Sequence, residues 1–281
     1  MDENRLTLED LKQYALYLKC EERSAATVEK YLREVTKFWS WLDGRVVSKP
    51  VVAQWKEALL SQGYHSSTIN GKLTALDRLL AFLGWTDCRV KHLKIQRKLF
   101  REDCRELTKD EYTRLIAAAQ ERGDTRLALL METICATGIR VSEVKYITLE
   151  AADCGKAEIS LKGKIRTILI PGKLCRKLLK YARKNKIASG ELFLTRSGKG
   201  MSRKQIWAQM KAVCKKAKVE PSKVFPHNLR HLFARTFYGV CRDVAKLADV
   251  LGHSSIETTR IYLISTGAEH TKTLEQLHLV L

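Results

Sequence analysis

The last part of this sequence places a phenol, two imidazoles and a guanidinium near one another along the chain. They belong to His227, Arg230, His253 and Tyr262. An arginine presents a planar fork that matches phosphate oxygens, and a histidine exchanges protons near neutral pH. A tyrosine attacks phosphorus once its proton is removed. Together these residue types predict transesterification at a phosphodiester without a metal ion.

Taken singly, none of these residues is decisive. His227 and Arg230 are three residues apart on a predicted helix, so both side chains face the same side of it. Such a pair arises easily by chance in a basic chain. A tyrosine at the end of a short helix, where we expect Tyr262, is usually a partly buried amphipathic side chain. The prediction depends on the whole set occurring together.

A metal site is a poor interpretation of the same stretch. His231 follows His227 at the spacing of helical zinc sites, but Asn228 stands where the H-E-x-x-H pattern has its glutamate base. No cluster of acidic residues suggests a two-metal nuclease. We expect neither a metal nor another cofactor.

The charge of the chain points to a polyanionic partner. Its 281 residues include 51 Lys and Arg against 31 Asp and Glu, a net charge of +20. Residues 1–100 hold 17 basic and 12 acidic side chains (+5), which leaves 34 and 19 (+15) for residues 101–281. Nucleic acid is the first candidate and an anionic membrane surface the second, since solvated lysine-rich faces alone also produce such a balance.

The cysteines and the hydropathy pattern predict a soluble, cytoplasmic protein, and binding to DNA would place such a protein at the nucleoid. No C-x-x-C spacing suggests a zinc ribbon or a disulfide framework. No signal peptide opens the chain, and no apolar run approaches the roughly 18 to 20 residues that span a bilayer. The eight cysteines are Cys20, Cys88, Cys104, Cys135, Cys154, Cys175, Cys214 and Cys241.

Four amphipathic helices are predicted in residues 1–89. The first follows a capping-box signal at Thr7 and Asp10, and the second covers residues 24–42 with apolar side chains at helical spacing. The third begins at Ser48 and ends at Gly63, and the fourth runs from about residue 67 to Gly84. We expect a helical domain at residues 1–89 and a basic interdomain linker at residues 90–106, although an exposed helix end explains the linker equally well.

A second domain is predicted at residues 107–281, with a C-terminal tail. It opens on a capping box at Thr108 and Glu111. A β-hairpin is expected from Glu158 to Ile170 with Lys162, Gly163 and Lys164 near its tip. The fold class is mainly α with a small β-sheet. Further helices are expected at residues 126–136, 141–147, 174–184, 204–216, 227–240 and 244–251, and a short strand at Leu192–Leu194.

Four passages in order along the chain resemble the tyrosine recombinase (phage integrase) family. They are Ala136–Glu143 (ATGIRVSE), Leu161–Arg166 (LKGKIR), Pro226–His231 (PHNLRH), and Leu251–His253 followed by Tyr262. The resemblance implies a helical core-binding (SAM-like) domain before a mixed α/β catalytic domain. It also implies that the separate arm-site-binding domain of some phage integrases is absent.

The resemblance assigns a role to each candidate residue. Tyr262 becomes the nucleophile that forms a 3′-phosphotyrosyl bond, and neither metal nor ATP is needed because this bond conserves the energy of the phosphodiester. Arg140 and Arg230 hold the nonbridging oxygens in the pentavalent transition state. His227 assists proton transfer and His253 bonds a phosphate oxygen. The proton for the leaving 5′-hydroxyl is expected from the hairpin lysine, which is Lys162 or, as second choice, Lys164.

The implied partner is double-stranded DNA with a short, specific core site. Strand exchange between two duplexes implies a homo-oligomer, a tetramer in the synaptic complex, and DNA integration by a mobile element is one setting for such an enzyme. Residues 268–281 form a short amphipathic segment that docks either on a neighbouring subunit or on its own domain. No membrane association is expected.

Two other functions fit much of the same sequence. A type IB topoisomerase uses a comparable set of residues to nick and reseal one duplex, and is distinguished by relaxing supercoils without exchanging strands. A non-catalytic DNA-binding protein on the same scaffold has the same charge and helices, and is distinguished by forming no covalent complex with DNA.

Overall fold

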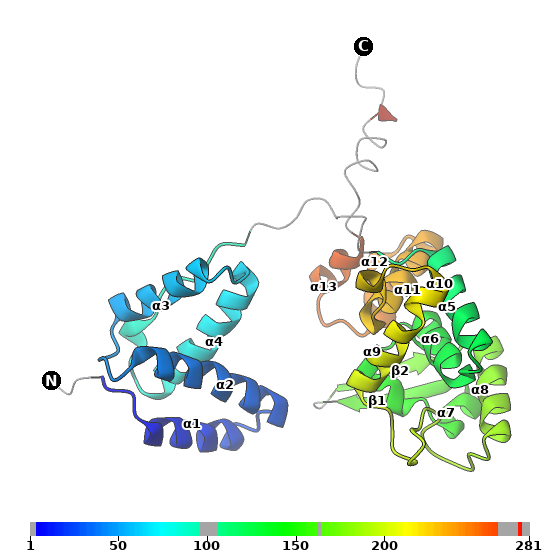
Figure 1. The fold of residues 1–281 in the computed structure, drawn as a ribbon, viewed down its shortest axis with the longest axis horizontal. Coiled ribbons are helices and arrows are strands. Elements are labelled where there is room, and N and C mark those ends of the chain that lie inside the picture. Colours follow the sequence, from blue (N-terminus) through cyan, green and yellow to red (C-terminus); the bar gives the residue numbers. More distant parts are fainter. Residues whose placement is uncertain (1–3, 96–105, 162–163, 264–274, 277–281) are drawn as a thin grey trace. The chain divides into compact units, whose positions relative to one another are not determined.

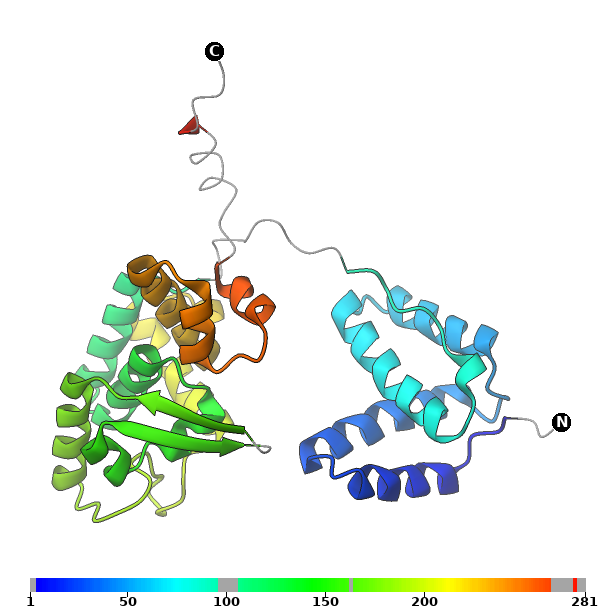
Figure 2. The same cartoon turned by 180° about the vertical axis from the view of Figure 1, so that it is seen from behind.

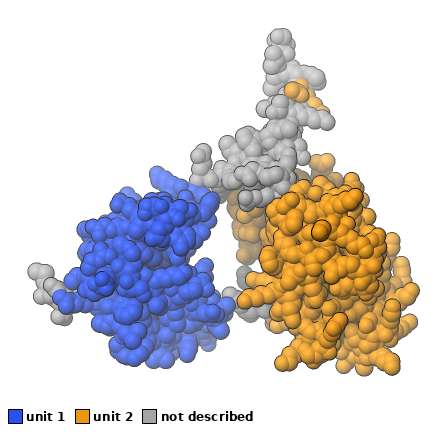
Figure 3. Space-filling model, in the orientation of Figure 1, with its two compact units in different colours: residues 1–97 blue, residues 98–281 orange. Residues whose placement is uncertain are grey.

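The computed structural model describes residues 4–95, 106–161, 164–263 and 275–276. The chain divides into two compact units, residues 1–97 and 98–281 (Figures 1 and 3). Most of the expected linker, at residues 96–105, lies outside the described residues. So does the expected docking tail, apart from Glu275 and Gln276. Within the described residues, no helix has the length and apolar character that a membrane span requires.

Unit 1 consists of helices whose ends are set by local signals. The Thr7 hydroxyl accepts a hydrogen bond from the Asp10 backbone N–H, and the Asp10 carboxylate accepts one from the Thr7 N–H at 2.8 Å, so the predicted capping box is present. Pro50 lies in the first turn of its helix, as expected. The elements are α1 (Leu8–Cys20), α2 (Ala25–Leu42), α3 (Lys49–Ser61), α4 (Ser66–Phe82) and the short 3-10 helix η1 (Thr86–Cys88).

The core of unit 1 contains one buried ion pair among apolar side chains. The Lys72 ammonium on α4 lies 2.6 Å from the Glu34 carboxylate on α2, and both side chains are less than 10% exposed. Burial raises the pKa of Glu34, but hydrogen bonds from Lys72 and Arg33 outweigh it and hold this pKa below its usual value. Truncating either partner would leave a buried charge, so the pair fixes how α2 lies on α4.

Unit 2 is mainly helical with one β-hairpin, and the predicted fold class is confirmed. Strands β1 (Lys156–Leu161) and β2 (Lys164–Leu169) are antiparallel, with Ile159 opposite Arg166. The predicted capping box of Thr108 and Glu111 opens α5. The other elements are α5 (Lys109–Glu121), α6 (Thr125–Thr137), η3 (Val141–Tyr146), α7 (Leu149–Cys154), α8 (Gly172–Lys184), α9 (Arg203–Ala212), α10 (Cys214–Ala217), η4 (Pro221–Lys223), α11 (Pro226–Cys241), α12 (Val244–Leu251), α13 (Ile256–Arg260) and η5 (Ile261–Leu263).

Three expected elements differ from the structure. Residues 192–194 form no strand: Glu191 and Leu194 make only isolated bridges, because no neighbouring strand runs alongside them. The helix expected at residues 204–216 is interrupted at Val213, where α9 ends and α10 begins. Residues 141–146 form a 3-10 helix rather than an α-helix. In each case the apolar pattern predicted which side chains are buried but did not determine the backbone conformation.

Helix α6 lies at the centre of unit 2 and positions the catalytic candidates. Its buried side chains pack against α5, α8 and α11. Gly138 ends α6 in the left-handed conformation (φ +65°), and a Cβ at this position would lie 2.4 Å from the Phe233 ring on α11. Glycine thus lets the chain turn closely against α11. The residue that follows two positions later is Arg140.

Candidate active site

Five of the predicted residues come together from four segments of unit 2. Arg140 precedes η3, His227 and Arg230 lie on α11, His253 follows α12, and Tyr262 lies in η5. In Figures 1 and 2, α11, α12 and α13 lie next to each other at one side of the unit. The roles of these residues remain predictions, but their convergence is a feature of the fold.

Arg230 is the centre of this arrangement. Its side chain is 1% exposed. The guanidinium donates to the Gly138 carbonyl through Nη1, and its Nε lies 3.4 Å from the Tyr262 hydroxyl oxygen. Burial lowers the pKa of Arg230, whereas its hydrogen bond to Tyr262 raises it. An arginine held by this many partners is fixed in one orientation before any ligand arrives.

Three guanidinium groups meet the C-terminal end of α12. The last carbonyls of a helix have no partner within it and carry a partial negative charge, so they attract cations. Each of three successive carbonyls here receives a hydrogen bond from a different arginine. The pairs are Arg166 with Val250 (2.9 Å), Arg230 with Leu251 (2.9 Å) and Arg140 with Gly252 (3.5 Å).

One buried carboxylate compensates two of these cations. Glu143 is 2% exposed and accepts a hydrogen bond from Arg140 Nη1 at 2.9 Å and one from Arg166 Nη1 at 3.3 Å. It also accepts from the Arg140 backbone N–H at 2.8 Å, which completes a capping box at the start of η3. Glu143 therefore holds both the backbone and the side chain of Arg140.

Arg166 reaches this network only because residue 252 is a glycine. A Cβ at Gly252 would lie 2.2 Å from Arg166 Cδ, and the backbone there is left-handed (φ +62°). Burial, followed by the charges of Arg230 and Arg140, lowers the pKa of Arg166 to about 10, although Glu143 raises it. The group remains cationic at neutral pH.

His253 is neutral at pH 7 and its tautomer follows from its partners. Its Nε2 lies 2.8 Å from Arg230 Nη2, and its Nδ1 lies 2.8 Å from the hydroxyl of the fully buried Thr259. A guanidinium only donates, so Nε2 accepts and the proton is on Nδ1. Burial, and after it the charges of Arg230, Arg140 and Arg166, lowers the pKa of His253 to about 4.

Tyr262 is surrounded by histidines. Its ring centroid lies 4.4 Å from that of His231, 5.6 Å from that of His253 and 5.8 Å from that of His227. Burial and the charges of Arg230 and Arg140 lower the pKa of His227, so this imidazole is neutral at pH 7 and able to accept a proton. Tyr262 is 5% exposed and packs with Leu247 and other apolar side chains of α11 and α12.

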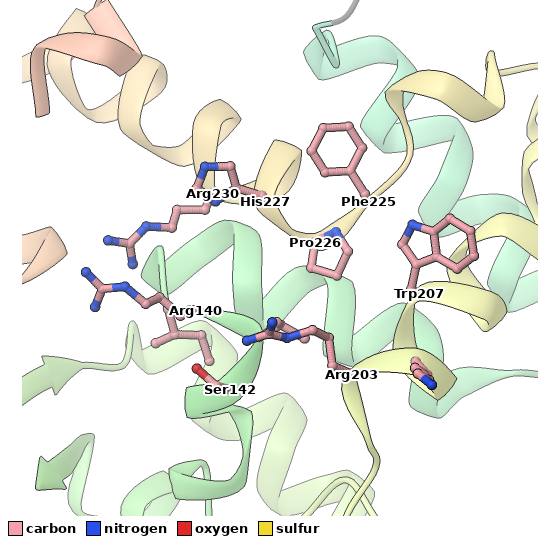
Figure 4. A pocket seen from close by; sticks show the side chains of 11 residues that line it. Arg140, Ser142, Arg203, Trp207, Phe225, Pro226, His227 and Arg230 are labelled. Atoms are coloured by element: carbon pink, nitrogen blue, oxygen red, sulfur yellow. The ribbon is translucent and has the colours of Figure 1, made fainter. Parts of the chain in front are cut away.

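A pocket of about 540 Å³ opens beside these residues (Figure 4). Arg140 and Arg230 extend in the same direction from opposite walls, and Trp207 lies at the other end of the view. Arg203 and Lys204 add positive charge to the pocket beyond that of the residues predicted from the sequence. Its lining includes Arg140, Ser142, Arg203, Lys204, Trp207, Phe225, Pro226, His227 and Arg230.

The two candidate hairpin lysines and four residues for which the sequence predicted no role remain to be placed. Lys162 lies outside the described residues, and Lys164 is the first residue of β2. Glu143, Arg166, Thr259 and His231 received no role from the sequence, although the capping-box spacing of Glu143 could have identified it. Among the described residues, no group of three or more His, Cys, Asp or Glu could hold a metal ion.

Comparison with known proteins accounts for both units. The model of the phage integrase family matches residues 105–269, and the model of the phage integrase N-terminal SAM-like domain matches residues 11–87. Tyrosine recombinase XerA of Pyrococcus furiosus is 29% identical and the match covers 100% of this chain and 98% of that protein. Tyrosine recombinase XerD of Bifidobacterium longum is 30% identical, with 89% and 91% covered.

The fold is also similar to that of solved structures. A lambda integrase tetramer bound to a Holliday junction has a TM-score of 0.72 at 19% identity, and the match covers 92% of this chain and 78% of that one. At this identity the likeness establishes the fold alone.

Proposed function

Since this chain belongs to the phage integrase family and is a site-specific DNA recombinase of the tyrosine class, we propose that it cleaves and rejoins DNA through an ester between Tyr262 and a 3′ phosphate. The single observation that carries this assignment is the hydrogen bond between Arg230 Nε and the Tyr262 hydroxyl oxygen at 3.4 Å. This contact supports the proposal, because a Tyr262 nucleophile would lie beside the cation that holds its phosphate.

The scissile phosphate binds between the Arg140 and Arg230 guanidinium groups in this proposal. Both line the pocket and neither needs to move far, because Glu143 and the carbonyls of Gly138, Leu251 and Gly252 already hold them. Negative charge grows on the nonbridging oxygens in the pentavalent transition state. Cations fixed in advance stabilise this charge without the cost of reorganisation. They take the place of a metal ion.

The proton balance uses one base and one acid. The Tyr262 oxygen attacks phosphorus, its proton passes to a base, and the bond from phosphorus to the 5′ oxygen breaks. We assign the base role to His227, whose lowered pKa keeps it neutral. The 5′ oxygen takes a proton from the hairpin lysine, assigned to Lys162 with Lys164 as second choice. Attack by a free 5′-hydroxyl reverses these steps and reseals the strand.

His253 changes its hydrogen bonding when DNA binds. In the structure its Nε2 accepts a hydrogen bond from Arg230. To donate to a phosphate oxygen instead, Nε2 must gain a proton, and the negative charge of an adjacent phosphodiester raises the pKa of an imidazole. His253 therefore becomes a phosphate ligand as the complex forms.

Duplex DNA with a short core site is the proposed substrate, with residues 1–89 as a second DNA-binding domain and residues 90–106 as the linker. The net charge of +20 and the matched SAM-like domain support this. A homotetramer is proposed for the synaptic complex, by analogy with the lambda integrase tetramer on its junction. The topoisomerase and the non-catalytic alternatives are not favoured, because the curated relatives are named tyrosine recombinases.

The test is covalent capture of DNA. A core site is first selected from a pool of random-sequence duplexes by binding, and is then presented as a nicked duplex that loses its 5′-hydroxyl fragment after cleavage. We expect a protein–DNA band on a denaturing gel, and none with Tyr262→Phe. The same band with Tyr262→Phe would overturn the assignment. Exchange of strands between two selected duplexes, rather than relaxation of supercoils alone, distinguishes a recombinase from a topoisomerase.

A further inference from the structure

Helix α8 carries an unusual concentration of positive charge on the outside of unit 2. Its 13 residues include no acidic side chain, and all its cations are exposed. Leu174, Leu178 and Ala182 on the opposite side are buried in the core, so the charged side faces away from the domain. The cations, which together define the α8 basic face, are Lys173, Arg176, Lys177, Lys180, Arg183 and Lys184.

These cations are largely uncompensated. Lys177 pairs with Glu132 of α6, with its Nζ 2.7 Å from the carboxylate. None of the other five forms an ion pair with any residue that the structure describes. Helix α2, by contrast, mixes both signs of charge, with Glu29, Lys30, Arg33 and Glu34 along its length. The excess on α8 therefore has no partner within the described parts of the protein.

The α8 basic face lies far from the catalytic candidates within unit 2. In Figures 1 and 2, α8 forms one edge of the unit, while α13 lies at the opposite edge. Because the apolar side of α8 faces the core, its cations point away from Tyr262. A duplex held at the catalytic pocket is contacted by another face of the unit.

The spacing of the cations suits the backbone of a duplex. Lys173 and Lys184 are separated by about 16 Å along the helix axis, with a cation at every third or fourth residue between them. Duplex DNA presents one phosphate charge per about 1.7 Å of its axis. A membrane surface is a poorer match, because an interfacial helix inserts its apolar side, and the apolar side of α8 is already buried.

We propose that the α8 basic face is a second binding surface for duplex DNA, which contacts the phosphate backbone of DNA outside the segment held at Tyr262. The choice of DNA as the occupant rests on the proposed function. Binding is sequence-independent because lysine and arginine at a helix surface meet phosphates rather than base edges. One subunit then holds two stretches of DNA, either the flank of its own site or part of a second duplex.

The first test measures the salt dependence of DNA binding. The variant Lys180→Gln/Arg183→Gln/Lys184→Gln is compared with Lys215→Gln/Lys216→Gln/Lys218→Gln, which removes three exposed charges near α10, both in the Tyr262→Phe background. The probe is a fluorescent mixed-sequence duplex of several helical turns, titrated by anisotropy at increasing KCl. We expect the slope of log K against log[KCl] to fall by about 2 to 3 in the α8 variant only. Equal slopes in the two variants would overturn the proposal, including the case in which the face serves an acidic protein.

The second test asks whether one protein joins two duplexes. An unlabelled mixed-sequence duplex is fixed to beads, loaded with protein, washed, and offered a second, labelled duplex. The protein with an intact α8 should capture the second duplex, the α10-region control should do so equally, and the α8 variant should lose most of the capture. Undiminished capture by the α8 variant would show that the second duplex binds elsewhere.

The outcomes separate this proposal from the proposed function. The α8 variant with Tyr262 intact should form the covalent complex on a nicked core-site duplex at the wild-type level, since α8 does not touch the catalytic pocket. If the α8 variant and the α10-region control had equal salt slopes, the proposed second surface would be wrong, but the role proposed for Tyr262 would be unaffected. If the wild-type protein formed no covalent complex but the salt slopes still differed, the role proposed for Tyr262 would be wrong and the second DNA-binding surface would be supported.

Discussion

Two groups of cations in unit 2 differ in almost every physical respect. At the end of α12, Arg230 is buried and Arg166 is only 12% exposed; these two and Arg140 donate to backbone carbonyls, and Glu143 binds Arg140 and Arg166. On α8 the cations are exposed, and only Lys177 has a described ion-pair partner. The first group is held in one geometry by the fold, and the second is free to follow its ligand.

The difference indicates two uses of positive charge. A buried, hydrogen-bonded guanidinium lies at a fixed point, is little screened by salt and stabilises charge that develops at that point. An exposed cation contributes attraction that tolerates changes of position and weakens as salt is added. Substitutions in the first group should therefore alter reaction rate and folding stability, and substitutions in the second should alter DNA affinity.

The largest effect is expected at Arg230. Arg230→Ala removes the cation nearest the Tyr262 hydroxyl and leaves the Gly138 and Leu251 carbonyls without this donor. Single-turnover formation of the covalent complex should slow by about 100- to 1,000-fold. Arg230→Lys keeps the charge but not the fork and should recover only a part of this loss. Cleavage by Arg230→Ala within tenfold of wild type would contradict the role of the buried group.

A smaller effect, on stability, is expected at Glu143. Glu143→Gln leaves Arg140 and Arg166 without their shared carboxylate, and the free energy of unfolding in urea should fall by about 2 to 4 kcal/mol, less than for a fully buried pair because Arg140 is partly exposed. Glu257→Gln breaks an exposed pair with Arg260 and should change it by less than about 0.5 kcal/mol. If Glu143→Gln and Glu257→Gln lowered the free energy of unfolding equally, the burial of Glu143 would add nothing to the stability of its ion pairs.

The pH dependence of stability should report His253. Its pKa is about 4 in the folded protein against an ordinary value near 6.5, so folding favours the neutral ring. This contribution is complete above pH 6.5 and is lost as the pH falls from 6.5 toward 4. Between pH 6.5 and pH 4, the free energy of unfolding of His253→Gln should therefore fall by about 1 to 3 kcal/mol less than that of wild type. Urea unfolding midpoints at several pH values in this range measure the difference. If the stability of this variant depended on pH as that of wild type does, a group other than His253 would be responsible for the pH dependence.

The smallest effect is expected on α8. The variant Lys180→Gln/Arg183→Gln/Lys184→Gln replaces exposed side chains by another good helix former, so its free energy of unfolding should stay within about 0.5 kcal/mol of wild type. Thermal denaturation followed by circular dichroism checks this. A large destabilisation would show that these cations support the fold and would erase the contrast with the α12 site.

The sequence predicted the parts of the molecule whose causes are local. Thr7 with Asp10 and Thr108 with Glu111 cap helices because each pair is three residues apart and needs no other part of the fold. The same reading was wrong at residues 192–194, where apolar side chains are buried but no second strand is alongside. It also missed the interruption at Val213. A pattern of burial does not by itself specify backbone pairing.

The chemical identity of the site came from the sequence, and its geometry came from the tertiary structure. Residue types and their order were enough to indicate a tyrosine nucleophile with arginines and histidines around it. The sequence did not predict the role of Arg166, its pairing with Glu143, the tautomer of His253 or the meeting of three guanidinium groups at the end of α12. These contacts join residues 21 to 112 positions apart. Only the packing of α6, α11, α12 and the hairpin brings such residues within hydrogen-bond distance, since helical periodicity relates only near neighbours in the chain.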